Sequence, residues 1–263
     1  MIPSHRWTDL TTTDLTAEAM HDMLAILPVA AVEQHGPHLP LGTDLFIMEG
    51  YLDRVSALLP ADFPALFLPI QAVGLSDEHI AFAGTLTLKP ETAIRVWTDI
   101  GESLHRAGCR KLVIVSSHGG NSPIIDIVAR DLRVRFGMVT VTVSWQRFGY
   151  PDGLFSQDEI QHGIHGGDIE TSLMLSFRPD LVRMQQARNF PSRGIQMSKD
   201  YQYLSISRPA GLGWMSQDLN ETGAIGDAGL ASSEKGEHAA THGVQAFITL
   251  LEEVRAFELQ ARQ

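Results

Sequence analysis

The sequence predicts an α/β fold, with a single domain over residues 1–263 built as three α/β/α layers around a mostly parallel central sheet. Three observations predict it. Apolar runs of strand length alternate with segments of helical periodicity at least three times. The first run, 24–32, is nearly all apolar, which is typical of a strand buried on both faces. No repeat, linker or low-complexity segment divides the chain.

The first predicted strand is the apolar run 24–32, which ends at Glu33. Pro28 within it indicates an edge position or a local bulge, because proline has no N–H to donate to a neighbouring strand. After a polar loop, Thr43 or Asp44 can cap a helix that runs to about residue 59, before Pro60. Residues 66–70 form a second short run and predict a second strand.

The middle of the chain repeats this alternation. A helix is expected to begin within 89–92, with proline in its first turn, and to end before Gly108. The clearest strand is 111–117, and it runs into the polar segment 118–121. Ser122 is then expected to cap the next helix, and 139–145 is a further β-branched strand.

The last third is less periodic. A short helix is expected over about 168–177 and a long final helix over about 232–259. Residues 185–230 are rich in Gly, Ser, Asn and Pro with weak periodicity, so we expect long active-site or interface loops there.

Composition excludes several partners. A net charge of −11 argues against a nucleic-acid binder, which needs positive charge. The single cysteine, Cys109, cannot form an internal disulfide and indicates a reducing compartment; we interpret it as a small half-buried residue. We find neither a secretory signal nor an apolar run near the roughly 20 residues of a membrane span, so we expect a cytoplasmic protein without membrane contact.

A first cluster of metal-ligand residue types follows the first strand: Glu33, His35, His38 and Asp44. Glu33 and His35 are two residues apart, so on an extended backbone both side chains project to the same side. Gly36, Pro37, Pro40 and Gly42 disfavour regular structure, and the loop can return Asp44 to the same place.

Two more clusters lie beside helix starts. Residues 117–121 (SHGGN) follow a strand, and the plain alternative is a tight turn with an incidental histidine. Residues 165–172 (HGGDIETS) bring His165 and Glu170 to a helix start, where acids can also simply complement the helix dipole. Ligands bind at the carboxyl edge of open α/β sheets, so the three clusters together predict one site.

The segment from Glu33 to Asp44, EQHGPHLPLGTD, resembles the signature of the creatininase family of amidohydrolases. The other segments that resemble family blocks are 78–85 (with Ala83 where proline is usual), 118–121, 165–172, 223–227 and 231–236. The resemblance covers nearly the whole chain.

This resemblance implies a site for two divalent ions, zinc or manganese, with Fe²⁺ as a further candidate. By analogy Glu33 and His118 bind one ion, His35 binds the other, and Asp44 bridges both. The enzyme that gives the family its name has His-Tyr-Glu-Asn at the second block, and its glutamate is a ligand. This chain has Gly120 there, so we expect Glu170 to fill the gap, directly or through water, and creatinine is in doubt as the substrate.

The expected activity is hydrolysis of a C–N amide bond in a small cyclic or formylated molecule. A metal-bound hydroxide would be the nucleophile and His165 the general acid, because a histidine has a suitable resting pKa. Backbone amides at Gly119 and Gly120 could hold the oxyanion. His38, His79 and Asn121 are expected to contact substrate or to orient ligands. The resemblance also implies a homo-oligomer, a hexamer.

Several alternatives stay open at this point. Ser116 and Ser117 precede a histidine, but no Gly-x-Ser-x-Gly elbow is present for a serine nucleophile. Family relatives include formamide deformylases, peptidases that trim a peptide-derived cofactor, and a hydrolase that opens a keto-inositol ring. A non-catalytic, metal-binding scaffold is the alternative of another class.

Overall fold

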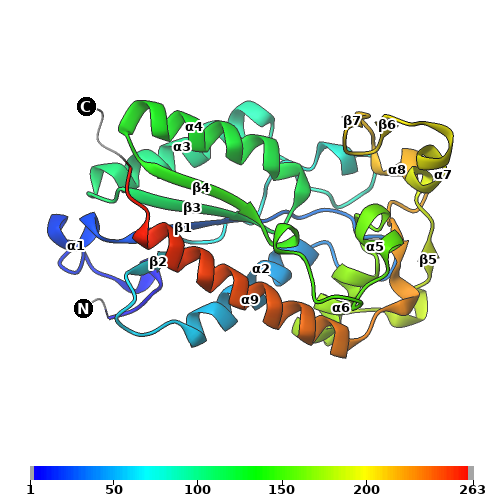
Figure 1. Cartoon of the computed structure of the whole chain (residues 1–263), viewed down its shortest axis with the longest axis horizontal. Coiled ribbons are helices and arrows are strands. Elements are labelled where there is room, and N and C mark those ends of the chain that lie inside the picture. The colour runs from blue at the N-terminus through cyan, green and yellow to red at the C-terminus, as the bar shows by residue number, and fades with distance from the viewer. Residues whose placement is uncertain (1–2, 260–263) are drawn as a thin grey trace.

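The computed structural model describes residues 3–259, and its centre is a parallel four-stranded sheet in the order β2-β1-β3-β4 (Figure 1). The strands are β1 (Leu24–Val29), β2 (Ala65–Phe67), β3 (Lys111–Ser116) and β4 (Val139–Ser144). In register, Leu24 pairs with both Ala65 and Lys111, and Lys111 pairs with Val139. The predicted parallel sheet is therefore confirmed.

The edge position predicted from Pro28 is wrong, because β1 is an interior strand. β2 pairs with β1 only from Leu24 to Ile26, so it has ended before the backbone reaches Pro28. The Pro28 carbonyl accepts a hydrogen bond from Gln71 N at 2.9 Å on that side. The missing N–H of the proline therefore breaks no ladder bond with β2.

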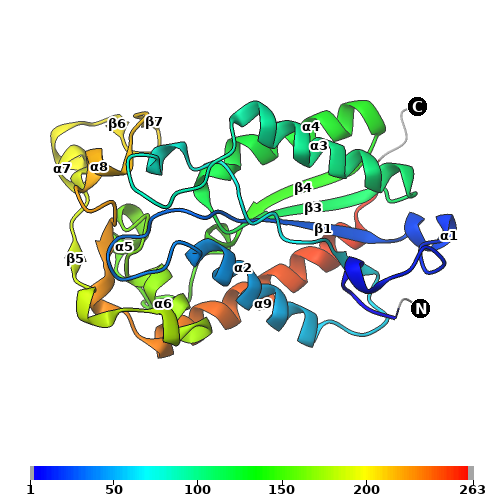
Figure 2. The same ribbon diagram turned by 180° about the vertical axis from the view of Figure 1, so that it is seen from behind.

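Helices cover both faces of the sheet, as the three-layer prediction requires (Figures 1 and 2). One face carries α3 (Pro90–Arg106) and α4 (Ser122–Phe136); the other carries α2 (Thr43–Leu58), α6 (Asp168–Phe177) and α9 (Ser233–Ala256). The two cores divide β1 by alternation: Leu24 and Ile26 belong to one cluster, and Ala25 and Leu27 to the other. This period of two is what a strand buried on both faces produces.

The boundaries of α3 and α4 test two predictions about helix ends. Pro90 is the first residue of α3, as predicted, and Gly108 after that helix has a φ of +101°. The predicted cap at Ser122 is wrong: a short 3-10 turn, Gly119–Asn121, runs directly into α4, so Ser122 is already helical. Among the residues that the structure describes, no helix is long and apolar enough to cross a membrane.

The segment predicted as loops over 185–230 contains short elements, which gather with α5 at the carboxyl ends of the strands (Figure 1). The remaining short elements are α1 (Ala17–His21), α5 (Gln157–His162), β5 (Asn189–Phe190), α7 (Arg193–Asp200), β6 (Leu204–Ser205), β7 (Ala210–Gly211), α8 (Ser216–Leu219) and β8 (Gly226–Asp227). The Ser192 side chain caps α7 by accepting from Gly194 N at 3.1 Å, in a stretch too polar to show helical periodicity. The elements α5, β5, α7, β6, β7, α8 and β8 are together called the C-terminal lobe below, whereas α1 lies at the opposite end of the molecule (Figure 1).

Candidate metal centre

The three predicted clusters meet at the carboxyl edge of the sheet. Glu33 and His35 follow β1, and His118 follows β3. Asp44 lies in the first turn of α2, while Glu170 lies in the first turn of α6 with His165 just ahead of it. Parallel strands end at one edge, so segments far apart in sequence deliver their side chains to one place. The convergence predicted from the sequence is present.

The ligand atoms lie at distances that suit a shared divalent ion. Nδ1 of His118 is 3.2 Å from Oε1 of Glu33 and 3.7 Å from Oδ2 of Asp44. Nε2 of His35 is 3.7 Å from Oδ2 of Asp44 and 3.7 Å from Oε2 of Glu170. Two ligands at about 2.1 Å from a tetrahedral ion are about 3.4 Å apart, so these spacings leave room for ions between the side chains.

Unpaired buried atoms test whether the residues fit a metal. Glu33 Oε1 and Oε2, His35 Nε2 and Asp44 Oδ2 are buried without a hydrogen-bond partner among residues 3–259. Glu33 is 0% exposed, and His35 and Asp44 are each 1% exposed. Leaving such an atom unpaired costs roughly 1–3 kcal/mol, more for a charged group. Divalent cations at the centre would pair these four atoms, so the residues fit a metal site.

Backbone carbonyls set the tautomers of three histidines. His35 donates from Nδ1 to the carbonyl of Glu33 at 3.1 Å, His118 donates from Nε2 to that of Leu75 at 2.8 Å, and His165 donates from Nε2 to that of Gln34 at 2.6 Å. A neutral imidazole has one N–H, so each ring turns its other nitrogen toward the centre. This is the usual way in which a second hydrogen bond orients a histidine ligand.

His79 differs from these three. The Gln34 side-chain amide donates to Nδ1 of His79 at 2.8 Å, so the proton of the neutral ring is on Nε2, 3.3 Å from Oε1 of Glu33. The rings of His35, His165 and His79 form a column with centroid spacings of 4.1 Å each. His79 therefore lies beside Glu33 and turns a protonated nitrogen toward it, and its supporting role stays a prediction.

The charges of the centre are strongly perturbed. Burial raises the pKa of Glu33, but His118 and its other histidine neighbours outweigh burial and hold it below the usual range. Burial and the Glu33 charge raise the pKa of Asp44 well above its usual value. Burial lowers the pKa of His118, yet Glu33 and Asp44 raise it well above the usual value overall. The metal-free centre thus holds protons that a cation would displace.

Gly120 lies against a carboxylate from another block. A Cβ at Gly120 would collide with the His118 ring and would lie 2.6 Å from Oε1 of Glu78. Oε1 of Glu78 is 3.6 Å from Nε2 of His118, and burial raises the pKa of this carboxyl. Glu78 lies in the segment 78–85 that resembles a family block, but only its proximity to His118 in the structure marks it as part of the centre.

The other predicted site residues support the loops. His38 contacts the Gly166 carbonyl at 2.9 Å and the Thr171 hydroxyl at 3.0 Å through Nε2, and burial lowers its pKa to about 4. Asn121 is fully buried; its amide donates to the Ala30 carbonyl at 3.0 Å, so it braces the loop behind His118. Gly119 is exposed, with open space around it in the described chain.

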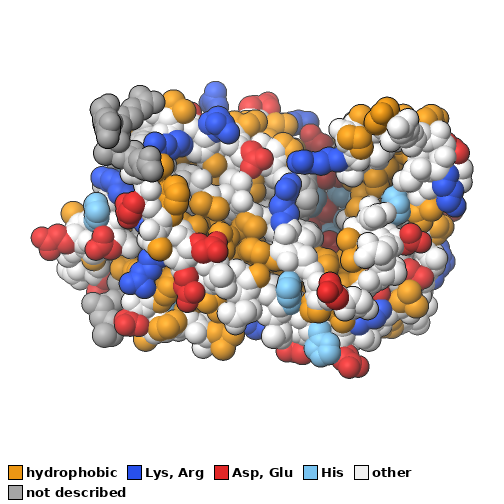
Figure 3. Space-filling model, in the orientation of Figure 1, with side chains coloured by type: hydrophobic (Ala, Val, Ile, Leu, Met, Phe, Trp, Pro, Cys, Tyr) orange, Lys and Arg blue, Asp and Glu red, His pale blue; other side chains and the backbone are white. Residues whose placement is uncertain are grey.

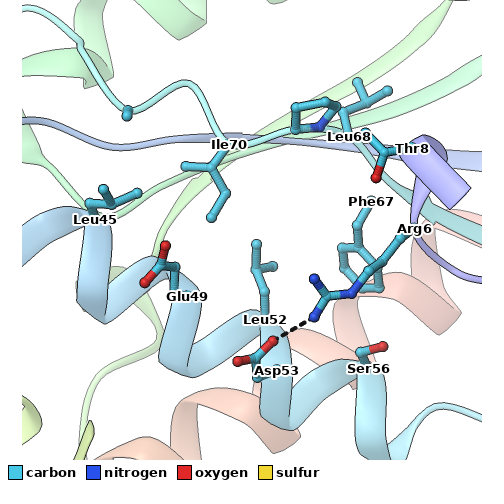
Figure 4. A pocket seen from close by; sticks show the side chains of 12 residues that line it. Arg6, Thr8, Leu45, Glu49, Leu52, Asp53, Ser56, Phe67, Leu68 and Ile70 are labelled. Carbon is cyan, nitrogen blue, oxygen red and sulfur yellow. Dashed lines mark hydrogen bonds and ion pairs between the residues drawn. The ribbon is translucent and has the colours of Figure 1, made fainter. Parts of the chain in front are cut away.

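The surface is hollowed beside the C-terminal lobe, with acidic and histidine side chains on the floor of the hollow (Figure 3). A separate cavity of about 590 Å³ lies between α2 and the N-terminal segment, where Arg6 pairs with Asp53 at 2.8 Å (Figure 4). Of the described residues that line this cavity, none belongs to the metal centre. The candidate metal centre therefore lies outside this cavity.

Comparisons with known proteins agree with this geometry. The family model Creatininase, described as creatinine amidohydrolase, matches residues 8–251. The chain is 30% identical to creatinine amidohydrolase of Pseudomonas putida over 83% of this chain and 85% of that enzyme. It is 32% identical to the mycofactocin precursor peptide peptidase of Mycobacterium tuberculosis (strain ATCC 25618 / H37Rv), over 80% of this chain and 77% of the relative.

Solved structures share the whole fold. A manganese creatininase superposes with a TM-score of 0.73 and 27% identity, covering 95% of this chain and 98% of that one. A Zn-Zn form of a creatininase variant superposes with a TM-score of 0.74 and 28% identity over the same shares of the two chains. The matched blocks, the fold and the ligand-type cluster together show that the chain belongs to the creatininase family of metal-dependent amidohydrolases.

Proposed function

We propose that this enzyme hydrolyses a C–N amide bond of a small cyclic or formylated molecule, using two divalent ions per subunit. The observation that carries the proposal is the set of buried, unpaired ligand atoms on Glu33, His35 and Asp44. Such atoms are costly unless a cation pairs them. Zinc and manganese are the expected ions, and imidazole with carboxylate also suits Fe²⁺.

The distances favour one ligand assignment. Glu33 and His118 would hold the first ion, and His35 and Glu170 the second. Asp44 suits the bridging position because its Oδ2 lies 3.7 Å from the facing nitrogen of each histidine. Oε2 of Glu170 accepts a hydrogen bond from Gly166 N at 2.6 Å, which orients the carboxylate expected to compensate for Gly120.

The protein side chains would handle the protons. When bound, the ions supply Lewis acidity for the amide carbonyl and a nucleophilic water at neutral pH. Nδ1 of His165 faces the centre, 3.7 Å from Oε1 of Glu33, while its Nε2–H is engaged with the Gln34 carbonyl. His165 can therefore accept a proton at Nδ1 and deliver it to the leaving nitrogen. The backbone amides of Gly119 and Gly120 are the candidate oxyanion donors.

Metal analysis combined with a substrate panel tests the proposal. The panel contains creatinine, formamidopyrimidines, small lactams and keto-inositols, each with added zinc or manganese. Glu33→Gln and His118→Ala should lose metal and turnover together, whereas the control Glu102→Gln, on the solvent side of α3, should keep both. Turnover that survives in a metal-stripped variant would refute the mechanism, and the absence of any turnover would refute the assigned reaction.

A second candidate is cleavage of a peptide. It is favoured by the 32% identity to the mycofactocin precursor peptide peptidase, and relatives further include a 3-dehydro-scyllo-inosose hydrolase and a deformylase of a formylaminopyrimidine. Product analysis separates these reactions: creatine, a released peptide, a ring-opened acid, or formate.

We also propose a homo-oligomer, the predicted hexamer. Exposed apolar side chains on the C-terminal lobe support it, with Tyr201 53% and Tyr203 65% exposed. Light scattering on the purified protein tests it, and a monomer at working concentration would refute it.

A further inference from the structure

Glu159 is a buried carboxylate that the proposed chemistry does not use. It lies on α5 and is 5% exposed. Its Oε1 accepts a hydrogen bond from Ile169 N at 3.2 Å, and its Oε2 accepts one from Asp227 N at 3.0 Å. A buried carboxylate without a cationic partner is costly, so one retained on two amide donors calls for an explanation.

Three glycines make room for this carboxylate. A Cβ at Gly163 or Gly167 would collide with the Glu159 carboxyl, and one at Gly226 would lie 2.9 Å from Oε2. Gly163 has a φ of −85° and Gly167 a φ of −81°, values open to other residues. At these two positions glycine is therefore needed for space and not for backbone conformation.

The two amides that Glu159 binds flank the third cluster. Ile169 lies in the first turn of α6, next to Glu170. Asp227 lies on β8, two residues after Ile225, whose backbone pairs with that of His165 at 3.2 and 2.6 Å. One carboxylate thus ties the start of α6 to the segment 225–227, in which Ile225 pairs with His165.

The two hydrogen bonds that Glu159 accepts indicate that its ionised form links the two segments. Both oxygens face N–H donors, so the ionised form satisfies both, whereas a protonated oxygen would turn its O–H toward an amide. The start of α6 adds favourable dipole charge. Burial raises the pKa of Glu159 to about 7, the nearby Asp168 also raises it, and the two amide hydrogen bonds oppose the rise.

We propose that Glu159 is a positioning residue which, through Ile169 and Asp227, holds His165 and Glu170 at the orientation that the metal centre requires. Glu159 itself touches neither ion nor substrate. The catalytic part of this inference rests on the proposed function; the positioning of His165 does not.

The experiment compares wild type with Glu159→Gln and Glu159→Ala. Glutamine keeps the shape but turns an N–H₂ toward one amide donor. Glu159→Gln should therefore retain part of the ion binding and of the kcat that Glu159→Ala loses. We expect about 10- to 100-fold weaker binding of the second ion and a similar fall in kcat, as when a group that orients a ligand is removed. Binding of the first ion should be unchanged. Leu132→Ala, in the core between α3 and α4, is the control for lost stability alone.

A readout on metal-free protein keeps this test separate from the proposed function. The Nε2–H of His165 is buried on the Gln34 carbonyl, so ¹⁵N-edited NMR should show it as a slowly exchanging imidazole proton. The signal should shift or vanish in both Glu159 variants and persist in Leu132→Ala. An unchanged signal in a folded Glu159→Ala overturns the inference, even if wild type turns over nothing on the panel.

Gly167→Ala provides an independent arm. Its Cβ should displace the Glu159 carboxylate and reproduce the NMR change in an otherwise wild-type chain. In the double variant with Glu159→Ala the two losses should not multiply, because both act through one contact. Multiplicative losses would show that the two residues act separately and would overturn the proposed link.

Discussion

We expect the buried acids of the metal centre to destabilise the metal-free protein and to stabilise the metal-loaded protein. Candidate ligand oxygens of Glu33 and Asp44 lie within 4.8 Å of each other, together with a nitrogen of His35. Two unit charges at that distance repel by about 3.5 kcal/mol at an effective dielectric constant of 20. His118 offsets part of this repulsion, because its Nδ1 is 3.7 Å from Asp44. Burial and Glu33 raise the pKa of Asp44, so the native metal-free protein at pH 8 must either bear this repulsion or take up a proton, and both cost stability. Asp44→Asn keeps the shape and removes that cost, so we expect the free energy of unfolding of the metal-free protein at pH 8 to rise by about 2 kcal/mol.

The metal-loaded protein should change in the other direction. An ion at 1,000 times its Kd stabilises the native state by about 4 kcal/mol, and Asp44→Asn should lose most of this because it removes a carboxylate that we propose as a metal ligand. Thermal unfolding with chelator and with excess Mn²⁺ should therefore rank wild type and variant in opposite orders. We expect a rise in Tm of about 4–8 °C without metal. The control Asp99→Asn, an exposed acid on α3, should change neither condition. A metal-free Asp44→Asn protein no more stable than wild type would refute the reasoning.

The remaining predictions concern single contacts. Gly120→Ala should lower stability by about 1–3 kcal/mol and reduce metal content, whereas Gly119→Ala, with open space around it in the described chain, should do neither; metal analysis and urea unfolding compare them. The pKa of Glu159 is raised from 4.5 to about 7, so its contribution to stability is complete below pH 4.5 and is lost as pH rises to 7. Between pH 4.5 and 7, the free energy of unfolding of Glu159→Gln should therefore rise by about 3 kcal/mol relative to that of wild type, as measured by urea unfolding. Lys235→Met removes the cation that pairs with the buried Asp168 at 2.5 Å and should cost about 1–3 kcal/mol by the same measurement, and a neutral result would contradict this.

Local sequence patterns predicted many of the helices and strands. Helix α6 occupies Asp168–Phe177, the predicted range, and α2 ends at Leu58, one residue from its predicted end. These elements have clear apolar periodicity and start or stop signals, which are properties of neighbouring residues. Helix α7 (Arg193–Asp200) was missed because it buries only Gly194 and Met197, too few apolar positions to show a period.

The candidate ligands could be predicted because they stand beside strand ends or helix starts. Glu33, His35 and His118 follow strands, whereas Asp44 and Glu170 lie in the first turns of helices. Glu78 and Glu159 act through residues distant in sequence: Glu78 approaches His118, and Glu159 binds amides of residues 169 and 227. Such contacts depend on how loops fold over one another, and a single sequence holds no local signal for them. The three glycines around Glu159 were visible, but their common neighbour was not.

Gly120 links these findings to the choice of substrate. A side chain there would occupy space that Glu78 and the Leu75 carbonyl already fill, so this chain has no room for the glutamate expected from the enzyme that names the family. In the two-ion arrangement proposed above, the second ion would draw its carboxylate from Glu170, whose orientation depends on Gly166 and, by our inference, on Glu159. The same block carries His165, so ligand geometry and proton delivery are coupled through one segment. In this arrangement changes in the C-terminal lobe would alter the reaction more readily than changes near Glu33, since the first ion would be held by residues that directly follow the strands of the central sheet.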